Sequence, residues 1–351
     1  MRLYYFFIII LVALSSCKKE EEEVSFANDY GAGMYISTSN GVSFFDGDSV
    51  KNHIYRNVNG TILSDVKKIK FKENKAYVLA VDRLYVANIE TFAERGYVGN
   101  FIDAVDFEFV SPEDRAFVVD KGDSKVKVVD IERMEITSDI ETGDATNPVF
   151  IITKWYRSIV MNGGAPADSL KDSTIVAIDY KDELVPLADM MGSLYVGENP
   201  NSGVNINNLK VLCKGIYDSN DLSTQTQSTL ATVNPWDMVL TSTKTLNGIY
   251  NAHNLLSNDN DNRYYFTAHD GVYRMNNTGG GIVQLLDIVS DVLFFQTESY
   301  NNTDTTTALS RMIYINDSEN NPGYIYKYNE ELSLVTDTII VDGSVRDISY
   351  Y

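Results

Sequence analysis

The sequence predicts an all-β fold, a propeller of seven four-stranded blades, from three observations. Short apolar runs alternate with turn residues throughout residues 30–351. A similar four-run unit recurs at intervals of about 40 to 50 residues. The start of this region lacks an inner strand, and its end contains only an inner strand, so that the two ends together can form one blade. A closed ring of sheets accounts for all three, because it removes the free sheet edges.

The most regular copy of the unit lies between Ala104 and Gly143. Val105, Phe107 and Phe109 alternate with acidic residues, and this period of two predicts a half-buried strand. Three more apolar runs follow, separated by turn residues: Ala116–Val119, Val126–Ile131 and Glu135–Ile140. Four antiparallel strands in about 40 residues are typical of one propeller blade.

The copies align on the run that should form the innermost strand of each blade. These runs begin at Asp65, Ala104, Pro148, Asn201, Asn251, Asp291 and Ser344. Each of the first six is followed by a second and a third apolar run. The spacing is uneven, and we attribute this to insertions in loops.

The last copy contains only an inner strand, because the chain ends after Ser344–Tyr351. The first segment, Gly33–Thr38 followed by Val42–Phe45, lacks an inner strand. We therefore expect the C-terminal strand to pair with the N-terminal strands and close the ring. The alternative is a β-sandwich, with or without a second domain. The repeats argue against it, and residues 30–351 are expected to form a single domain.

Residues 1–16 are predicted to be a signal peptide. The apolar stretch Leu3–Leu14 is short for a membrane span, which needs about 20 residues. It ends in Leu14-Ser15-Ser16-Cys17, which resembles a bacterial lipobox, and Cys17 is the expected site of lipidation. The other possibility is an ordinary signal peptide followed by an unmodified cysteine.

Residues 17–29 are expected to form an acidic tether after the acylated cysteine. The run Lys18–Glu23 resembles the export signal of some Gram-negative surface lipoproteins. The predicted location is the outer membrane through a lipid anchor, facing the cell surface, with the periplasmic face as the alternative.

Composition limits the possible functions. The net charge of −20 disfavours binding to nucleic acid, which depends on Lys and Arg. The chain has only 3 histidines, which leaves little material for a histidine-based metal site or a catalytic triad. With Cys17 acylated, Cys213 has no disulfide partner, and its apolar surroundings predict a core position. No cofactor is expected.

Two blades carry motifs that resemble those of YncE-like, YVTN-type propellers. The first comprises Ser111–Asp120 and Val126–Asp130, and the second comprises Glu198–Ser202 and Leu209–Gly215. The second resembles a lipoprotein branch of the family, although Lys210 stands where an aromatic residue is frequent. The resemblance implies a seven-bladed surface lipoprotein. Some similar propellers capture cobalamin for a TonB-dependent transporter, but no residue here carries that ligand over.

Ligand-binding residues are predicted on the face that carries the loops between second and third strands. The longest of these loops are Gly163–Ser173 and Gly215–Ser228. The candidate residues are Arg83, Lys121, Tyr217, Asp218 and His269. Long polar loops are also tolerated simply as insertions. Trp155 and Trp236 fall on the opposite face, where we expect them to pack rather than to stack on a ligand.

Three functions remain open. The leading hypothesis is a non-enzymatic module that binds a small molecule or an envelope protein, as an accessory to a TonB-dependent transporter. The second is an envelope scaffold. The third is a lactonase-like hydrolase with a calcium ion held by residues that precede the inner strands, namely Asp65, Asp103, Asn147, Asn199, Asn251 and Asp291. These six can equally be turn residues.

Overall fold

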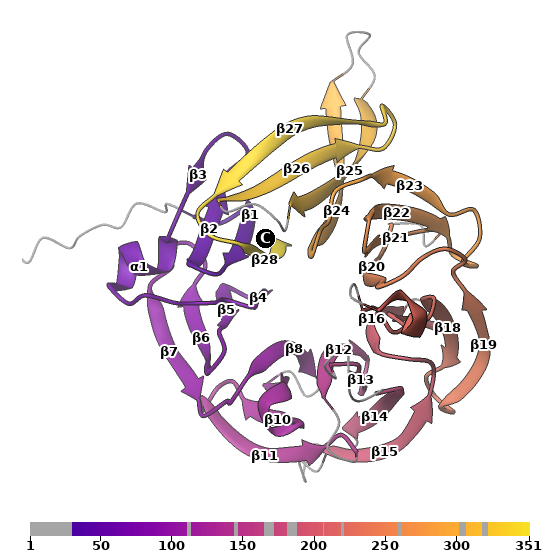
Figure 1. Cartoon of the computed structure of the whole chain (residues 1–351). Coiled ribbons are helices and arrows are strands. Elements are labelled where there is room, and N and C mark those ends of the chain that lie inside the picture. The colour runs from indigo at the N-terminus through magenta and orange to yellow at the C-terminus, as the bar shows by residue number, and fades with distance from the viewer. Residues whose placement is uncertain are drawn as a thin grey trace, which may run out of the picture.

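A ring of seven four-stranded antiparallel sheets makes up the structure, as predicted (Figure 1). The structure is a computed structural model, and it describes residues 30–110, 114–143, 147–164, 172–180, 188–205, 207–218, 221–258, 262–301, 307–317 and 322–351. The motif residues Ser111–Glu113, part of the Gly163–Ser173 loop, and Cys17 with its flanking segments lie outside these ranges.

Each blade runs from an inner strand to an outer one. Blade 1 contains β4 (Lys68–Lys72), β5 (Lys75–Leu79), β6 (Arg83–Asn88) and β7 (Glu94–Gly99). Blade 2 contains β8 (Ala104–Val110), β9 (Arg115–Asp120), β10 (Lys125–Asp130) and β11 (Glu135–Glu141). Blade 3 contains β12 (Pro148–Lys154), β13 (Arg157–Asn162), β14 (Thr174–Tyr180) and β15 (Ala188–Tyr195). Blade 4 contains β16 (Pro200–Asn205), β17 (Leu209–Cys213), β18 (Thr229–Asn234) and β19 (Val239–Thr245).

The remaining blades follow the same order. Blade 5 contains β20 (His253–Ser257), β21 (Arg263–Ala268), β22 (Gly271–Asn276) and β23 (Val283–Leu286). Blade 6 contains β24 (Leu293–Asn301), β25 (Thr307–Asp317), β26 (Gly323–Asn329) and β27 (Leu334–Val341). Blade 7 combines β28 (Val345–Tyr350) with β1 (Met34–Thr38), β2 (Gly41–Phe45) and β3 (Val50–Lys51). Short helical turns occur at α1 (Ile54–Asn59), η1 (Lys121–Asp123) and η2 (Leu222–Thr224).

The predicted ring closure is confirmed. Strand β28 is the inner strand of blade 7 and pairs antiparallel with β1, with Met34 opposite Tyr350. Beyond the register, Gly33 and Tyr351 exchange two backbone hydrogen bonds of 3.1 and 3.0 Å. The C-terminal strand thus joins the two ends of the ring, and no sheet edge is left open there.

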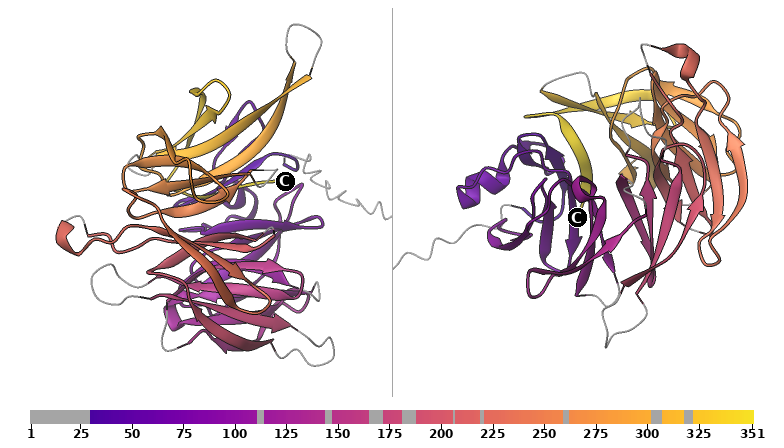
Figure 2. Two further views of the ribbon diagram at one scale, coloured as in Figure 1. Left: turned by 90° about the vertical axis from the view of Figure 1, so that its right-hand side faces the viewer. Right: turned by 60° about the horizontal axis from the view of Figure 1, so that its bottom comes forward.

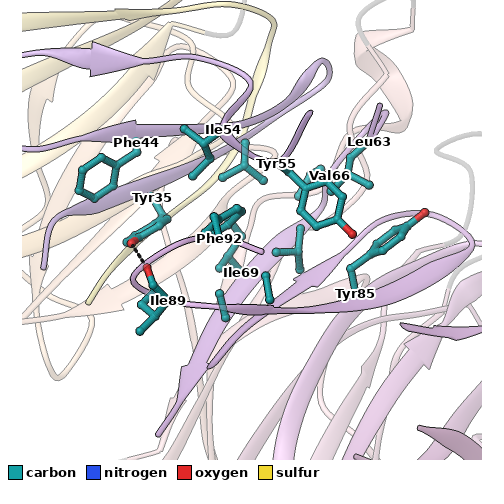
Figure 3. Close-up of a cluster of buried hydrophobic side chains, with 14 of the residues drawn as sticks. Tyr35, Phe44, Ile54, Tyr55, Leu63, Val66, Ile69, Tyr85, Ile89 and Phe92 are labelled. Atoms are coloured by element: carbon teal, nitrogen blue, oxygen red, sulfur yellow. Dashed lines mark hydrogen bonds between the residues drawn. The ribbon is translucent and has the colours of Figure 1, made fainter. Parts of the chain in front are cut away.

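Apolar side chains fill the spaces between neighbouring blades, as Figure 3 shows for blades 7 and 1. Tyr35 and Phe44 from blade 7 pack against Ile69 of blade 1 and Phe92 of its outer connection. The Tyr35 hydroxyl donates to the carbonyl oxygens of Gly31 and Ile89 at 2.9 and 3.3 Å. Burial raises the pKa of this phenol, which is therefore neutral at physiological pH.

The ring has two unlike faces. We call the face where the inner strands begin the upper face, and the face where they end the lower face. The upper face carries the loops between second and third strands, including η2, which projects from the ring in the side view of Figure 2. The described chain begins at the lower face, where the Tyr30 N–H donates to Glu90 O at 3.1 Å in a connection between third and fourth strands.

Candidate functional site

Two lysines occupy equivalent positions on the upper face. Lys121 directly follows β9 and Lys214 directly follows β17, each the second strand of its blade. Neither side chain makes a hydrogen bond or an ion pair within the part of the chain that the structure describes. The pKa of Lys214 is lowered, first by burial and then by the positive charge of Lys121, while the charge of Asp291 opposes this. The charges of these two cations, from blades 2 and 4, therefore act on each other.

An acid and two further basic side chains lie at the upper ends of neighbouring blades. The His253 Nε2 lies 3.7 Å from Asp291 Oδ1. The pKa of Asp291 is lowered, first by His253 and then by the charges of Arg346 and Lys214. Arg346 reaches from β28 to Asp65, with Nε 2.9 Å from Oδ1. We call Lys121, Lys214, His253, Asp291 and Arg346 the upper cluster.

The tautomer of His253 follows from its contacts. Its Nδ1 lies 2.8 Å from the carbonyl oxygen of Asn251, which can only accept a hydrogen bond. Nδ1 therefore carries a proton in either form of the ring. Nε2 points a proton at Asp291 when the ring is charged, and it is an acceptor when the ring is neutral. Both Nε2 and the Asp291 carboxylate can then accept protons from one water molecule placed between them. This arrangement can hold and activate a nucleophilic water.

Asn199 adds a neutral polar group beside Lys214. Its carbonyl oxygen accepts from the Lys214 N–H at 2.9 Å, and its Nδ2 donates to Gly215 O at 2.8 Å. The side chain is buried, yet its Oδ1 has no hydrogen-bond partner among the described residues. A buried acceptor without a partner requires a donor from water or from a ligand hydroxyl.

The predicted site residues are only partly brought together. Tyr217 and His269 lie side by side with ring centroids 5.3 Å apart, and Tyr250 meets His269 edge-on at 5.8 Å. Tyr217 is in the loop that begins at Lys214, so this aromatic wall adjoins the upper cluster. Asp218 belongs to the same loop, and its carbonyl oxygen accepts from Gln225 Nε2 at 2.9 Å.

Arg83 lies elsewhere. It begins the third strand of blade 1, and its guanidinium stacks on the Tyr97 ring of the outer strand at 4.8 Å. Its Nε is 3.3 Å from Asp82. We predicted that Arg83 and Lys121 line the same site because both lie in loops that follow second strands. The Arg83 side chain instead turns toward Tyr97 on the outer strand β7.

The upper-cluster residues Lys214, His253 and Arg346 were not among the predicted binding residues, and Asp291 was named only as a calcium ligand. A signal for Lys214 was present, since it follows the motif Val211-Leu212-Cys213 in the way that Lys121 follows Val118–Asp120. Arg346 belongs to the closing strand, and its place at the cluster depends on ring closure.

The residues proposed for calcium act mainly in turns. Asp65, Asn199 and Asn251 have positive φ of 50°, 53° and 57°, a region in which Asn and Asp are enriched. Asp65 is also neutralised by Lys67 at 2.5 Å and by Arg346. Within the described ranges no group of three or more His, Cys, Asp or Glu side chains is placed to hold a metal ion.

A second set of charges lies deeper along the inner strands. Lys68 Nζ is 2.7 Å from Asp106 Oδ1, and Lys70 Nζ is 2.5 Å from Glu108. Asp106 also accepts from the Ile151 N–H at 3.0 Å, which links blades 1, 2 and 3. Burial raises the pKa of Asp347 on the neighbouring inner strand β28, and the charge of Lys68 opposes this. These groups neutralise one another and hold the inner strands together.

A cavity of about 450 Å³ opens on the lower side between blades 6 and 7. Its charged groups pair internally, since Glu298 accepts from Tyr314 Oη at 2.5 Å and lies 2.7 Å from Lys327 Nζ. The burial and hydrogen bond of Tyr314 raise its pKa. This cavity lies on the opposite face from the upper cluster, and its Glu298 and Lys327 already pair with each other.

No protein-family model matches the chain, and no curated protein is similar to it in sequence. Solved propellers of similar fold include a periplasmic gluconolactonase from Pseudomonas aeruginosa, with 11% identity over 91% of this chain and 98% of that chain and a TM-score of 0.62. A candidate 6-phosphogluconolactonase from Bacteroides fragilis shares 10% identity over 92% and 99% of the two chains, with a TM-score of 0.64. A protein from Lactobacillus plantarum shares 8% identity over 91% and 99%, with a TM-score of 0.65.

These similarities confirm the seven-bladed fold, whereas the YncE-like family remains a resemblance. They also correct one expectation. We expected a non-enzymatic protein because the chain has only 3 histidines, and this expectation is wrong, since solved propellers of similar fold include a gluconolactonase. At 8 to 11% identity the likeness itself shows the fold alone.

Proposed function

We propose that the protein binds small anionic, hydroxyl-rich molecules at the upper cluster and hydrolyses a lactone of that class there. The observation that carries the proposal is the pair Lys121 and Lys214 on the upper face, whose charges act on each other and whose side chains make no hydrogen bond or ion pair among the described residues. Half-buried cations that make no ion pair favour an anionic ligand, although the charge of Asp291 partly offsets that of Lys214. The free Oδ1 of Asn199 favours a ligand with hydroxyl groups.

The hydrolysis step follows from the His253–Asp291 pair. A water held between Nε2 and the carboxylate attacks the lactone carbonyl carbon, and Nε2 takes its proton. The negative charge on the carbonyl oxygen is stabilised by Lys214 or Arg346. When the intermediate collapses, the ring C–O bond breaks and the leaving alkoxide takes the proton from Nε2. The product is a hydroxy acid, whose carboxylate the two lysines attract.

The test measures acid release from glucono-δ-lactone and from its 6-phosphate, with spontaneous hydrolysis subtracted. We expect the wild type to accelerate hydrolysis of at least one of them. His253→Gln should abolish the acceleration while leaving binding of the product acid in place. The matched control is His53→Gln, because His53 forms a similar pair with Asp342 at 2.7 Å and also contacts a carbonyl, but lies outside the upper cluster.

Two results would contradict parts of the proposal. Wild-type protein that binds gluconate but releases no acid would remove the hydrolytic step and leave a binding function. Equal loss of activity in His53→Gln and His253→Gln would show that the assay reports folding and not the site.

The cellular location is a further part of the proposal. Leu14–Cys17 and Lys18–Glu23 support lipidation at Cys17 and display on the outer membrane, where such a site could serve a TonB-dependent transporter. Among the described residues no helix is long and apolar enough to cross a bilayer. Incorporation of labelled palmitate into the wild type but not into Cys17→Ser would support the anchor, and protease treatment of intact cells would test display.

A further inference from the structure

An exposed aromatic cluster lies on the lower face between blades 3 and 4. Trp155 and Tyr156 form the two-residue turn between β12 and β13, and Trp236 lies in the turn between β18 and β19. The two indoles stack with centroids 5.4 Å apart and planes at 23°, and Tyr156 contacts Trp236 at 5.5 Å. Trp155 is 70% exposed. Our expectation that the tryptophans are packed is therefore wrong for Trp155.

The cluster is held rigidly. Arg157 is buried and pairs with the carboxylate of Asp179, with Nη2 2.6 Å from Oδ2. Its Nη1 donates to Pro235 O at 2.8 Å, which ties the turn of blade 3 to that of blade 4. Trp155 itself has a φ of 58°, a region that bulky residues rarely adopt.

Most of the exposed large hydrophobic side chains in the described ranges lie on the lower face. Among them are Val239, Val283, Leu332, Leu334 and Tyr350. They follow the ring from blade 4 to blade 7, and the aromatic cluster continues the arc into blade 3. Exposed apolar side chains gathered on one face are available to an interaction partner.

The described chain enters at the same face. Tyr30 packs against Phe44 and Phe92, close to the lower end of β1. Residues 17–29 precede it, and at about 3.3–3.6 Å per residue they extend to at most about 45 Å. If Cys17 is acylated, the lower face is the one held nearest to the membrane.

We propose that the lower face rests on a lipid bilayer, with Trp155, Tyr156 and Trp236 at the level of the headgroups. Indole and phenol rings favour this layer because they combine an apolar body with a polar edge. Lys154, whose Nζ lies 5.6 Å from the Trp155 ring, can reach the phosphate groups of the lipids. The net charge of −20 favours zwitterionic over anionic lipids. The proposal uses the predicted anchor but not the proposed ligand site, and it leaves the upper cluster facing away from the membrane.

The test uses the fact that the chain has 2 tryptophans, both in this cluster, so its tryptophan fluorescence reports on these two rings. Full-length protein is reconstituted into phosphatidylcholine vesicles with or without brominated acyl chains. We expect brominated lipid to quench most of the tryptophan emission and the emission maximum to move to shorter wavelength. Aqueous iodide should quench the vesicle-bound protein less than it quenches the protein in buffer without vesicles. Emission that is insensitive to brominated lipid and fully open to iodide on vesicle-bound protein would overturn the proposal.

Two variants sharpen the result. Trp155→Asn suits the left-handed backbone and removes the most exposed ring, and it should weaken bromine quenching of the remaining Trp236. Cys17→Ser separates the lipid anchor from the docking face. We expect this variant no longer to float with vesicles, yet brominated lipid in excess should still quench its tryptophans, because the docking face is retained. Protection from iodide by a soluble envelope protein or a glycan, with no effect of lipid, would assign the face to that partner and contradict the membrane proposal.

Discussion

Two pairs of lysines lie near the axis of the ring, and they differ in how their charges are balanced. Lys68 and Lys70 on the inner strand of blade 1 contact Asp106 and Glu108 at 2.7 and 2.5 Å. Lys121 and Lys214 on the upper face have no such contacts in the described structure, and burial lowers the pKa of Lys214. Cations of the first kind hold strands together, whereas cations of the second kind remain available to a ligand. The following variants separate these two roles.

Deletion of Ser344–Tyr351 should have the largest effect, because it removes the strand that closes the ring. The truncation takes away strand β28 and with it Asp347, Arg346 and the buried Ile348. It also leaves β1 as an open inner edge. We expect loss of cooperative thermal unfolding, measured by circular dichroism. A truncated protein that melts at the wild-type temperature would refute ring closure as the source of stability.

Asp106→Ala should lower the free energy of unfolding by about 3 kcal/mol, the usual cost of breaking a buried ion pair. Asp106 is 2% exposed and accepts from both Lys68 and the Ile151 N–H. Asp139→Ala is the matched control, since Asp139 contacts Lys125 at 3.1 Å on the surface, and its loss should cost less than about 1 kcal/mol. Equal destabilisation in denaturant titrations would mean that the inner pair is not structural.

The pH dependence of ligand affinity should reveal the unpaired lysines. Because the pKa of Lys214 is lowered, its positive charge is lost at a lower pH than that of an ordinary lysine. Affinity for gluconate should therefore decline as pH rises toward alkaline values. Lys121→Gln removes a repelling charge, so it should raise the pKa of Lys214 and move the decline to higher pH while weakening binding overall. Calorimetric titration across pH would detect both, and an unshifted decline would show that the two lysines do not interact.

The fold was largely predictable because each blade repeats the same pattern. Runs such as Val105–Phe109 show the period-two alternation of a strand, and their recurrence led to seven blades. The strands missing from the two ends of the sequence led to the pairing of β28 with β1. Turn residues such as Asp65 and Asn251 also matched their positions before inner strands.

The candidate site was less predictable, because it depends on how side chains turn at loop ends. Arg83 and Lys121 occupy comparable sequence positions, yet Arg83 stacks on Tyr97 whereas the charge of Lys121 acts on Lys214. The approach of Arg346 to Asp291 joins residues from the last strand and from the entry to blade 6, and no local pattern indicates it. Exposure of Trp155 likewise follows from a tight turn held by Arg157.

Calorimetric binding of gluconate and 6-phosphogluconate to the wild type and to Lys121→Gln/Lys214→Gln tests the central claim most directly. Lys125→Gln is the control, because Lys125 is a surface lysine that is already paired with Asp139 and Glu141. The account predicts that the double variant loses at least about tenfold in affinity, which is about 1.4 kcal/mol, while the control binds as the wild type does. Wild-type affinity in the double variant, with its melting temperature unchanged, would contradict the assignment of the upper cluster as an anion site.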